Sequence, residues 1–286
     1  MDNLNKKILI TGGSGYIGRN LIDNLQNKYY VYSIGRRFLN LKNYFVCDIT
    51  NNDNLKKIIV QIQPDVVIHC AGISNLVFCE KHPDITWEVN FEGTKNLIKT
   101  LKSFGLEVKF IFLSSDYVFN GKTGNYKEDD IPSPITVYGK VKYEIEKLIQ
   151  QEFSNYTICR TANVYGNGGG SFFNFVIDNL KCNKKIEIFE DTFFTPTQIN
   201  NLIEMIDLIV TKDIRGILHT VGAERINRYN FAKKIARRFN LNDNLIIPTS
   251  RPSNSLIAYD SSLNSEKTQR LLGIKFLTID EGLKNL

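Results

Sequence analysis

The stretch ITGGSGYIG, residues 10–18, constrains the fold of this 286-residue chain more than any other feature. It follows a short apolar run, KILIT, that predicts a buried strand, and it leads into a segment with helical periodicity. Its first glycine permits a tight turn, its second lets the backbone approach a pyrophosphate, and its third lets the helix lie close to the strand. Because no Gly-Lys-Ser/Thr follows, a P-loop nucleotide triphosphatase is excluded. The stretch therefore predicts a dinucleotide site whose residues are Gly12, Gly15, Tyr16, Ile17 and Gly18.

Short apolar runs and longer helical stretches alternate through the first half of the chain. The predicted strands are 7–11, 29–34, 44–47, 65–70, 108–115 and 156–161. The predicted helices are 16–25, 55–62, 85–104 and 137–149. Repeated strand–helix–strand units imply a parallel sheet covered on both faces. The predicted fold class is therefore α/β, with a doubly wound parallel sheet of the Rossmann type.

The alternation weakens after Tyr165, which predicts a smaller mixed α/β lobe. Helical patterns occur at 171–181, 199–211, 229–239 and 264–272, and strand-like pieces at 186–189 and 216–221. We therefore predict an NAD(P)-binding domain at 1–164 and a smaller substrate-binding lobe at 165–286. The segment 199–221 could return to the large sheet.

Composition narrows the functional classes. The net charge is +6, but the basic residues are spread along the chain without a Lys/Arg tract, which favours a small polyanionic ligand over nucleic acid. The five cysteines form no CxxC pair and are odd in number, so a reducing, cytoplasmic location is expected without a disulfide framework. The three histidines have no ligand-like spacing, so no metal is expected. No membrane span is expected either.

The end of the second predicted strand bears on cofactor choice. An enzyme that prefers NAD places an acid there, on the adenosine ribose, whereas this chain has Arg36 and Arg37. Guanidinium groups match a phosphate dianion, so we predict NADP(H), with Arg36 as the first contact and Arg37 as the second. NAD(H) stays open as the alternative.

The stretch YGKVK places Tyr138 and Lys142 four residues apart, on one face of a predicted helix. Alone, this spacing is typical of an ordinary helix surface. Together with the glycine turn, it resembles the extended short-chain dehydrogenase/reductase superfamily. The segments Asp48-Ile49, HCAG (69–72), SSDYVF (114–119) and RTANVYG (160–166) narrow the resemblance to the dTDP-4-dehydrorhamnose reductases.

That resemblance implies a catalytic set of Ser115, Tyr138 and Lys142. Tyr138 would protonate the alkoxide that forms when hydride reaches a keto carbon, and Ser115 would stabilise it. Lys142 would lower the pKa of Tyr138 and hold the nicotinamide ribose. The resemblance adds Asp48, Ile49, Cys70, Ala71 and Gly72, besides Tyr138 and Lys142, to the cofactor-binding residues. It assigns substrate contacts to Ser74, Ser115, Asp116, Tyr117 and Asn163.

The implied function is NADP(H)-dependent reduction of a 4-keto group on a nucleotide-activated deoxysugar, for deoxysugar or surface-polysaccharide synthesis. Asp116 is followed by Tyr117 and not by Glu, which argues against a dehydratase. Asn163 replaces the family's Trp, and Val77-Phe78 replaces its Asp-Lys, so the sugar stays open. Two alternatives remain: an epimerase with tightly bound NAD, and a non-catalytic NADP-binding regulatory subunit. The nucleotide also stays open, and a homodimer is expected only by analogy.

Overall fold

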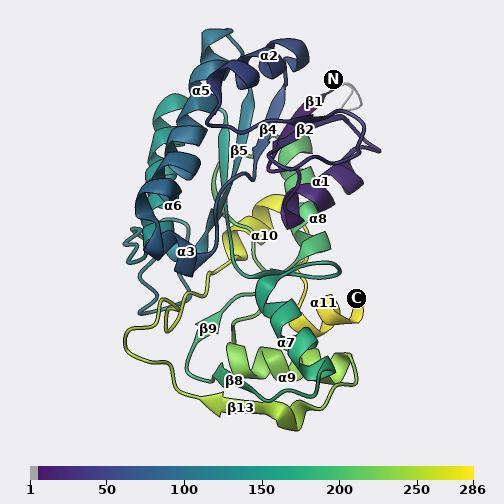
Figure 1. The fold of residues 1–286 in the computed structure, drawn as a ribbon, viewed down its shortest axis with the longest axis vertical. Coiled ribbons are helices and arrows are strands. Elements are labelled where there is room, and N and C mark those ends of the chain that lie inside the picture. Colours follow the sequence, from purple (N-terminus) through teal and green to yellow (C-terminus); the bar gives the residue numbers. More distant parts are fainter. Residues whose placement is uncertain (1–5) are drawn as a thin grey trace. The chain divides into compact units, whose positions relative to one another are not determined.

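A computed structural model describes residues 6–286, and the centre of the fold is a seven-stranded sheet with the order β11-β6-β5-β4-β1-β2-β3 (Figure 1). The pairs β1–β2, β2–β3, β1–β4 and β4–β5 are all parallel. From β1 the chain moves outward through β2 and β3, and then crosses back to β4 on the other side of β1. This confirms the predicted doubly wound α/β fold. The strands are β1 Lys7–Thr11, β2 Tyr30–Gly35, β3 Tyr44–Val46, β4 Val66–His69, β5 Lys109–Ser115, β6 Tyr156–Thr161 and β11 Gly216–His219.

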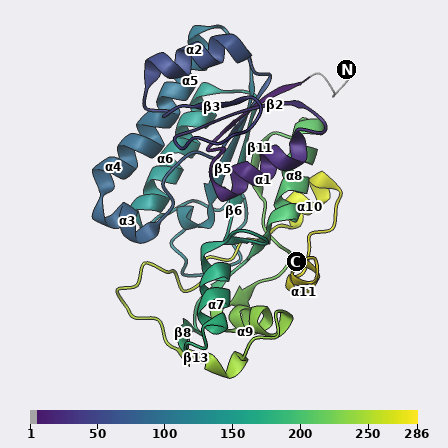
Figure 2. The same cartoon turned by 45° about the vertical axis from the view of Figure 1, so that its right-hand side comes forward.

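Helices cover both faces of this sheet. Figures 1 and 2 show α1 (Tyr16–Leu25) on one face, and α2 (Asn52–Ile62), α5 (Gly93–Ser103) and α6 (Val137–Glu152) on the other. Alternate strand residues such as Leu9, Val67 and Phe110 pack with the second group of helices in one buried cluster. Their neighbours along the strands are equally buried, which explains the near-continuous apolar runs in the sequence.

The helix predicted at 85–104 is divided into shorter pieces. Helix α4 (Pro83–Trp87) leads into a π-helical turn, η2 (Glu88–Glu92), before α5 begins. A further short helix that the periodicity did not predict, α3 (Leu76–Lys81), begins after Asn75, whose side chain accepts a hydrogen bond from the N–H of Phe78 at 2.9 Å. These pieces lie between β4 and α5, next to the carboxyl end of the sheet.

The later part of the chain forms three two-stranded sheets and several helices around a second core. The sheets are β10-β7, β12-β9 and β13-β8, and aromatic residues such as Phe173, Phe194 and Phe231 form the centre of the core. The strands are β7 Val164–Tyr165, β8 Ile186–Phe189, β9 Phe193–Phe194, β10 Thr197–Gln198, β12 Ile226–Asn227 and β13 Ile246–Thr249. The helices are α7 Ser171–Lys181, α8 Ile199–Thr211, α9 Arg228–Arg238, α10 Glu266–Leu272 and α11 Ile279–Lys284, with a 3₁₀ turn at η4 (Asp243–Leu245). An earlier 3₁₀ turn, η3 (Asp116–Val118), directly follows β5.

The chain passes repeatedly between two compact units. The first contains the chain up to Val118, Pro134–Cys159 and Ile206–Ile217, and the second contains Phe119–Ser133, Arg160–Met205 and Leu218–Leu286. The domain boundaries at 1–164 and 165–286 stay a prediction. Residues 1–5 lie outside the part of the chain that the structure describes. No helix within residues 6–286 has the length and apolarity needed to cross a bilayer.

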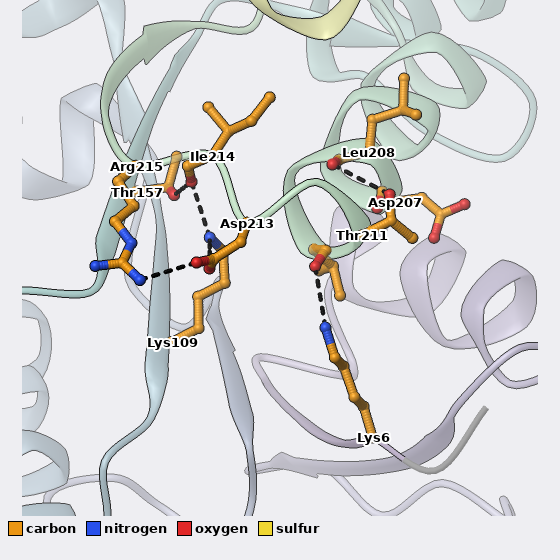
Figure 3. A network of polar contacts seen from close by, with 10 residues as sticks. Lys6, Lys109, Thr157, Asp207, Leu208, Thr211, Asp213, Ile214 and Arg215 are labelled. Atoms are coloured by element: carbon orange, nitrogen blue, oxygen red, sulfur yellow. Dashed lines mark hydrogen bonds and ion pairs between the residues drawn. The ribbon is translucent and has the colours of Figure 1, made fainter. Parts of the chain in front are cut away.

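Polar contacts attach the segment 206–217 to the first unit (Figure 3). The ammonium of Lys109, on β5, donates to the carboxylate of Asp213 at 3.0 Å and to the carbonyl of Ile214 at 2.8 Å. Thr157, on β6, donates to the same carbonyl at 2.6 Å. Since Lys109 is only 5% exposed, these contacts satisfy a charge that lies inside the protein.

Candidate active site

A cavity of about 400 Å³ lies at the carboxyl ends of β1, β2 and β4, where the direction of chain progression reverses. Ligands of open α/β sheets bind at this position. The lining includes the predicted residues Gly12, Gly15, Arg36, Arg37, Asp48, Ile49, Cys70, Ala71 and Gly72. It also includes Ser14, Ile34, Gly35, Cys47 and Val89, which were not predicted. All but Val89 lie within two residues of a predicted position, so extending each motif by a residue or two would have found these four.

The three glycines of the turn meet different steric demands. Gly12 has φ of 72°, and a Cβ there would lie 2.8 Å from the backbone nitrogen of Ala71. A Cβ on Gly18 would lie 2.3 Å from the carbonyl oxygen of Gly12, so the closeness of α1 and β1 requires glycine. A Cβ on Gly15 would meet only that same oxygen, at 3.2 Å. Packing within the protein therefore requires glycine least at Gly15, which lines the cavity.

Helix α1 begins at this cavity. Gly15 is its N-cap residue, and no side chain caps the first turn, so the N–H groups at this end are available to an anion. The side chains of Tyr16 and Ile17 are not part of the lining. Within the described residues the buried hydroxyl of Tyr16 has no hydrogen-bond partner, and burial raises its pKa to about 12.

Arg36 and Arg37 are exposed at the rim of the cavity. Neither guanidinium makes an ion pair or hydrogen bond to any residue between 6 and 286, so both cations can accept an anion. Asp48 differs, because its carboxylate accepts hydrogen bonds from the N–H and the hydroxyl of Thr50, at 3.0 and 2.8 Å. Asp48 thereby fixes the turn after β3 that forms part of the lining.

The first turn of α6 is held by contacts from three sides. The hydroxyl of Thr136 accepts a hydrogen bond from the N–H of Gly139 at 3.1 Å and caps the helix. The carboxylate of Glu80, on α3, accepts from the N–H of Val137 at 2.6 Å. A Cβ on Gly139 would lie 2.0 Å from the carbonyl oxygen of Tyr117. The glycine of YGKVK thus allows α6 to approach η3, the turn that follows Ser115.

Ser115 and Tyr138 meet at the end of β5. The Ser115 hydroxyl donates to the carboxylate of Asp116 at 2.9 Å and accepts from the N–H of Tyr117 at 3.2 Å. Tyr138 is only 9% exposed, and its ring centroid lies 6.1 Å from that of Tyr117. Burial raises the pKa of Tyr138 above its usual range, and a hydrogen bond with Ser115 opposes part of that rise. Near neutral pH the phenol therefore keeps its proton.

Lys142 is placed differently from the expectation. Its ammonium donates to the carbonyl of Leu113 at 2.7 Å and lies 4.4 Å from the ring centroid of Phe112, but 5.8 Å from that of Tyr138. The prediction that Lys142 lowers the pKa of Tyr138 is wrong for this arrangement, because burial dominates and the ammonium is turned toward Leu113. Burial also lowers the pKa of Lys142, to about 8.

The predicted substrate residues fall into two groups. Asp116 and Tyr117 lie on η3 directly after Ser115, and Ser74 is exposed before α3. Asn163 belongs to the second unit, where its φ of 41° is left-handed. Separately, Val77 and Phe78 lie on α3, where they line a second hollow of about 560 Å³.

This sheet, glycine turn and Ser–Tyr–Lys set define a protein of the extended short-chain dehydrogenase/reductase superfamily. Within it, the chain belongs to the family described as the RmlD substrate binding domain, whose model matches residues 6–286.

Three relatives illustrate what the chain is similar to. A crystal structure of dTDP-4-dehydrorhamnose reductase from Bacillus anthracis, in complex with NADP, has a TM-score of 0.88 at 28% identity and covers 98% of each chain. Methionine adenosyltransferase 2 subunit beta of Bos taurus is 28% identical over 88% of this chain and 80% of its own length. The spore coat polysaccharide biosynthesis protein SpsK of Bacillus subtilis is also 28% identical, over 88% of this chain and 89% of its own length.

Proposed function

We propose that this protein is an NADP(H)-dependent reductase that acts on a 4-keto group of a nucleotide-activated deoxysugar, for deoxysugar or surface-polysaccharide synthesis. One observation carries the proposal: Ser115 and Tyr138 lie together at the end of β5, in the same unit as a cavity lined by the glycine turn and two exposed arginines. The similarity to a dTDP-4-dehydrorhamnose reductase solved with NADP supports both the reaction class and the cofactor. The similarity to SpsK supports the polysaccharide role.

The residues present fit NADP(H). The open side of Gly15 and the uncapped end of α1 suit a pyrophosphate, and the exposed guanidinium groups of Arg36 and Arg37 suit the 2′-phosphate. Asp48 and Ile49 line the part of the cavity proposed for the adenine, and Lys142 is the proposed donor to the nicotinamide ribose hydroxyls. When bound, the reduced cofactor supplies a hydride.

The proton comes from the protein. The Ser115 hydroxyl, on leaving the carboxylate of Asp116, donates to the substrate carbonyl and stabilises negative charge as it develops on that oxygen. Tyr138 holds a proton that its raised pKa keeps in place near neutral pH, and it transfers this proton to the alkoxide. The ammonium of Lys142 stays on the carbonyl of Leu113, and its proposed part is to hold the nicotinamide ribose.

A second candidate is a non-catalytic NADP-binding subunit, which the similarity to methionine adenosyltransferase 2 subunit beta favours. In either case we place the protein in the cytoplasm, because its five cysteines are all free.

The test is NADPH oxidation by the purified protein with 4-keto-6-deoxy sugars linked to dTDP, UDP, GDP or CDP. We expect one nucleotide series to give stoichiometric oxidation and a 4-hydroxy product. Tight NADPH binding without oxidation in any series would instead support the regulatory subunit. Interconversion of sugars by retained NAD(H), without NADPH consumption, would support the epimerase.

A further inference from the structure

His69, the last residue of β4, is fully buried beneath the wall of the cavity. Its ring stacks on Phe112, with the centroids 5.7 Å apart and the planes 23° apart. Its Nδ1 lies 2.6 Å from the hydroxyl of Thr11 on β1, and its Nε2 lies 2.8 Å from the hydroxyl of Thr94 on α5. The mechanism above uses none of these three side chains.

The surrounding contacts assign every proton in this chain of hydrogen bonds. The Thr94 hydroxyl has one hydrogen, and it donates that hydrogen to the carbonyl of Asn90 at 2.5 Å. Thr94 can therefore only accept from His69, so Nε2 carries a proton. A neutral ring then has a bare Nδ1, which accepts from the hydroxyl of Thr11. The oxygen of Thr11 in turn accepts from the N–H of Ala71 at 3.2 Å.

The hydrogen bonds that run from Thr11 through His69 to Thr94 reach the segment 70–73, which follows β4, at both of their ends. At one end, Ala71 lines the cavity beside Cys70 and Gly72. At the other end, the side chain of Asn90 accepts from the N–H of Ile73 at 2.7 Å and donates to its carbonyl at 2.9 Å. Asn90 lies in the π-helical turn η2, so the turn and the segment are connected through His69 as well as directly.

We propose that His69, fixed as its Nε2–H tautomer between Thr11 and Thr94, is a positioning residue that holds the segment 70–73 in the shape of the cofactor wall. The cofactor part of this proposal rests on the proposed function.

Electrostatics favour the neutral ring that this assignment assumes. Burial, with a smaller effect from the charge of Lys142, lowers the pKa of His69 to about 3. The ring is therefore neutral at working pH, which leaves Nδ1 without a proton. A protonated ring would need an acceptor at Nδ1, and the only hydrogen of Thr11 would then have no partner in this chain of contacts.

The decisive variant is Thr94→Val, which keeps the shape of the side chain and removes the acceptor of the Nε2 proton. Thr100 is a matched control, because it lies on the same helix, is equally buried and has a hydroxyl with no partner within the described residues. Thr94→Ser restores the hydroxyl. We expect Thr94→Val to raise the Kd for NADPH about tenfold, in line with one lost buried hydrogen bond, with less than about a twofold change in kcat. Thr100→Val and Thr94→Ser should bind like the parent.

A cofactor-independent measurement separates this proposal from the proposed function. Exchange of the Ala71 and Ile73 amide hydrogens should accelerate about tenfold in Thr94→Val and not in Thr100→Val. If the parent binds no NADP(H), the proposed function fails, and this exchange experiment still decides the holding role. Unchanged exchange in a folded Thr94→Val, or equal acceleration in Thr100→Val, would overturn that role.

Nitrogen-resolved NMR of the parent protein tests the tautomer without any substitution. The His69 signals can be assigned through the contact of its ring with Phe112. We expect a proton on Nε2 and a bare Nδ1. A protonated Nδ1 would refute the assigned direction of every hydrogen bond in the chain.

Discussion

The contrast between Gly15 and Gly18 gives the most discriminating prediction. The two residues lie three positions apart in one turn, yet a methyl group added at each would meet different surroundings. At Gly18 the new carbon would lie 2.3 Å from the carbonyl oxygen of Gly12, an overlap that requires β1 and α1 to move apart. At Gly15 the nearest atom is that same oxygen at 3.2 Å, and the remaining space belongs to the cavity.

Gly18→Ala should therefore act on stability. Overpacking of this kind costs about 1–3 kcal/mol, which lowers Tm by about 2–4 °C for each kcal/mol in a protein of this size. Gly15→Ala should change the free energy of unfolding by less than about 1 kcal/mol, because its φ of −83° suits alanine and only a modest N-cap preference is lost. It should instead displace the pyrophosphate, and losing one hydrogen bond to a charged group costs about 1.5–3 kcal/mol, or roughly 10- to 150-fold in Kd.

The assay combines thermal unfolding with calorimetric titration of NADPH for the parent and both variants. We expect Gly15→Ala to unfold near the parental temperature and to bind NADPH weakly, and Gly18→Ala to unfold earlier. Parental NADPH affinity in Gly15→Ala would refute the reasoning, because the pyrophosphate would then lie elsewhere. A Gly15→Ala variant destabilised as strongly as Gly18→Ala would refute the steric argument.

Three further predictions concern the charged and catalytic groups. Arg36→Ala should weaken NADPH by about 10- to 150-fold and leave NADH nearly unchanged in titrations of both cofactors, because one charge-assisted contact to the 2′-phosphate is lost; equal losses would indicate a structural role. Tyr138→Phe should keep NADPH affinity and slow single-turnover hydride transfer by roughly 10²–10⁴-fold, and near-parental transfer would remove Tyr138 from the mechanism. Because burial lowers the pKa of Lys142 to about 8, the ammonium is present below that pH and lost above it, so the Kd for NADPH should rise between pH 7 and 9.5. Lys142→Met should bind weakly with no such rise, and an identical rise in that variant would exclude Lys142 as its source.

The sequence predicted the regular elements of the first half well, because buried parallel strands such as Lys7–Thr11 and Val66–His69 have continuous apolar runs. It missed the division of the helix at 85–104. That segment keeps helical periodicity throughout, and the partner of Asn90 in the π-helical turn is Ile73, which lies outside the helix. Two-residue strands such as Phe193–Phe194 were missed because so few residues carry no periodicity.

The candidate site was likewise predictable from the sequence only in part. The sequence did predict that glycines and arginines next to predicted strands line the cavity, because the ends of parallel strands meet at one edge of the sheet. The protonation state of Tyr138 could not be predicted from the sequence, because its pKa depends on burial and on the direction in which the Lys142 ammonium points. The roles of Ser74 and Asn163 stay predictions. His69 was noted only as part of HCAG, since the partners that fix its tautomer, Thr11 and Thr94, are distant in the sequence.

The contacts of Lys109 have a consequence for synthesis on the ribosome. Its partner Asp213 follows 104 residues later, and β11, the edge strand of the sheet beside β6, follows later still. While the chain emerges, the sheet therefore has an unpaired edge at β6, and the ammonium of Lys109 lacks its carboxylate, until about three quarters of the protein has been made. A nascent chain of residues 1–164 would expose that edge to other chains. We expect such a truncated fragment to aggregate or to recruit chaperones, whereas a fragment that extends beyond residue 219 can close the sheet.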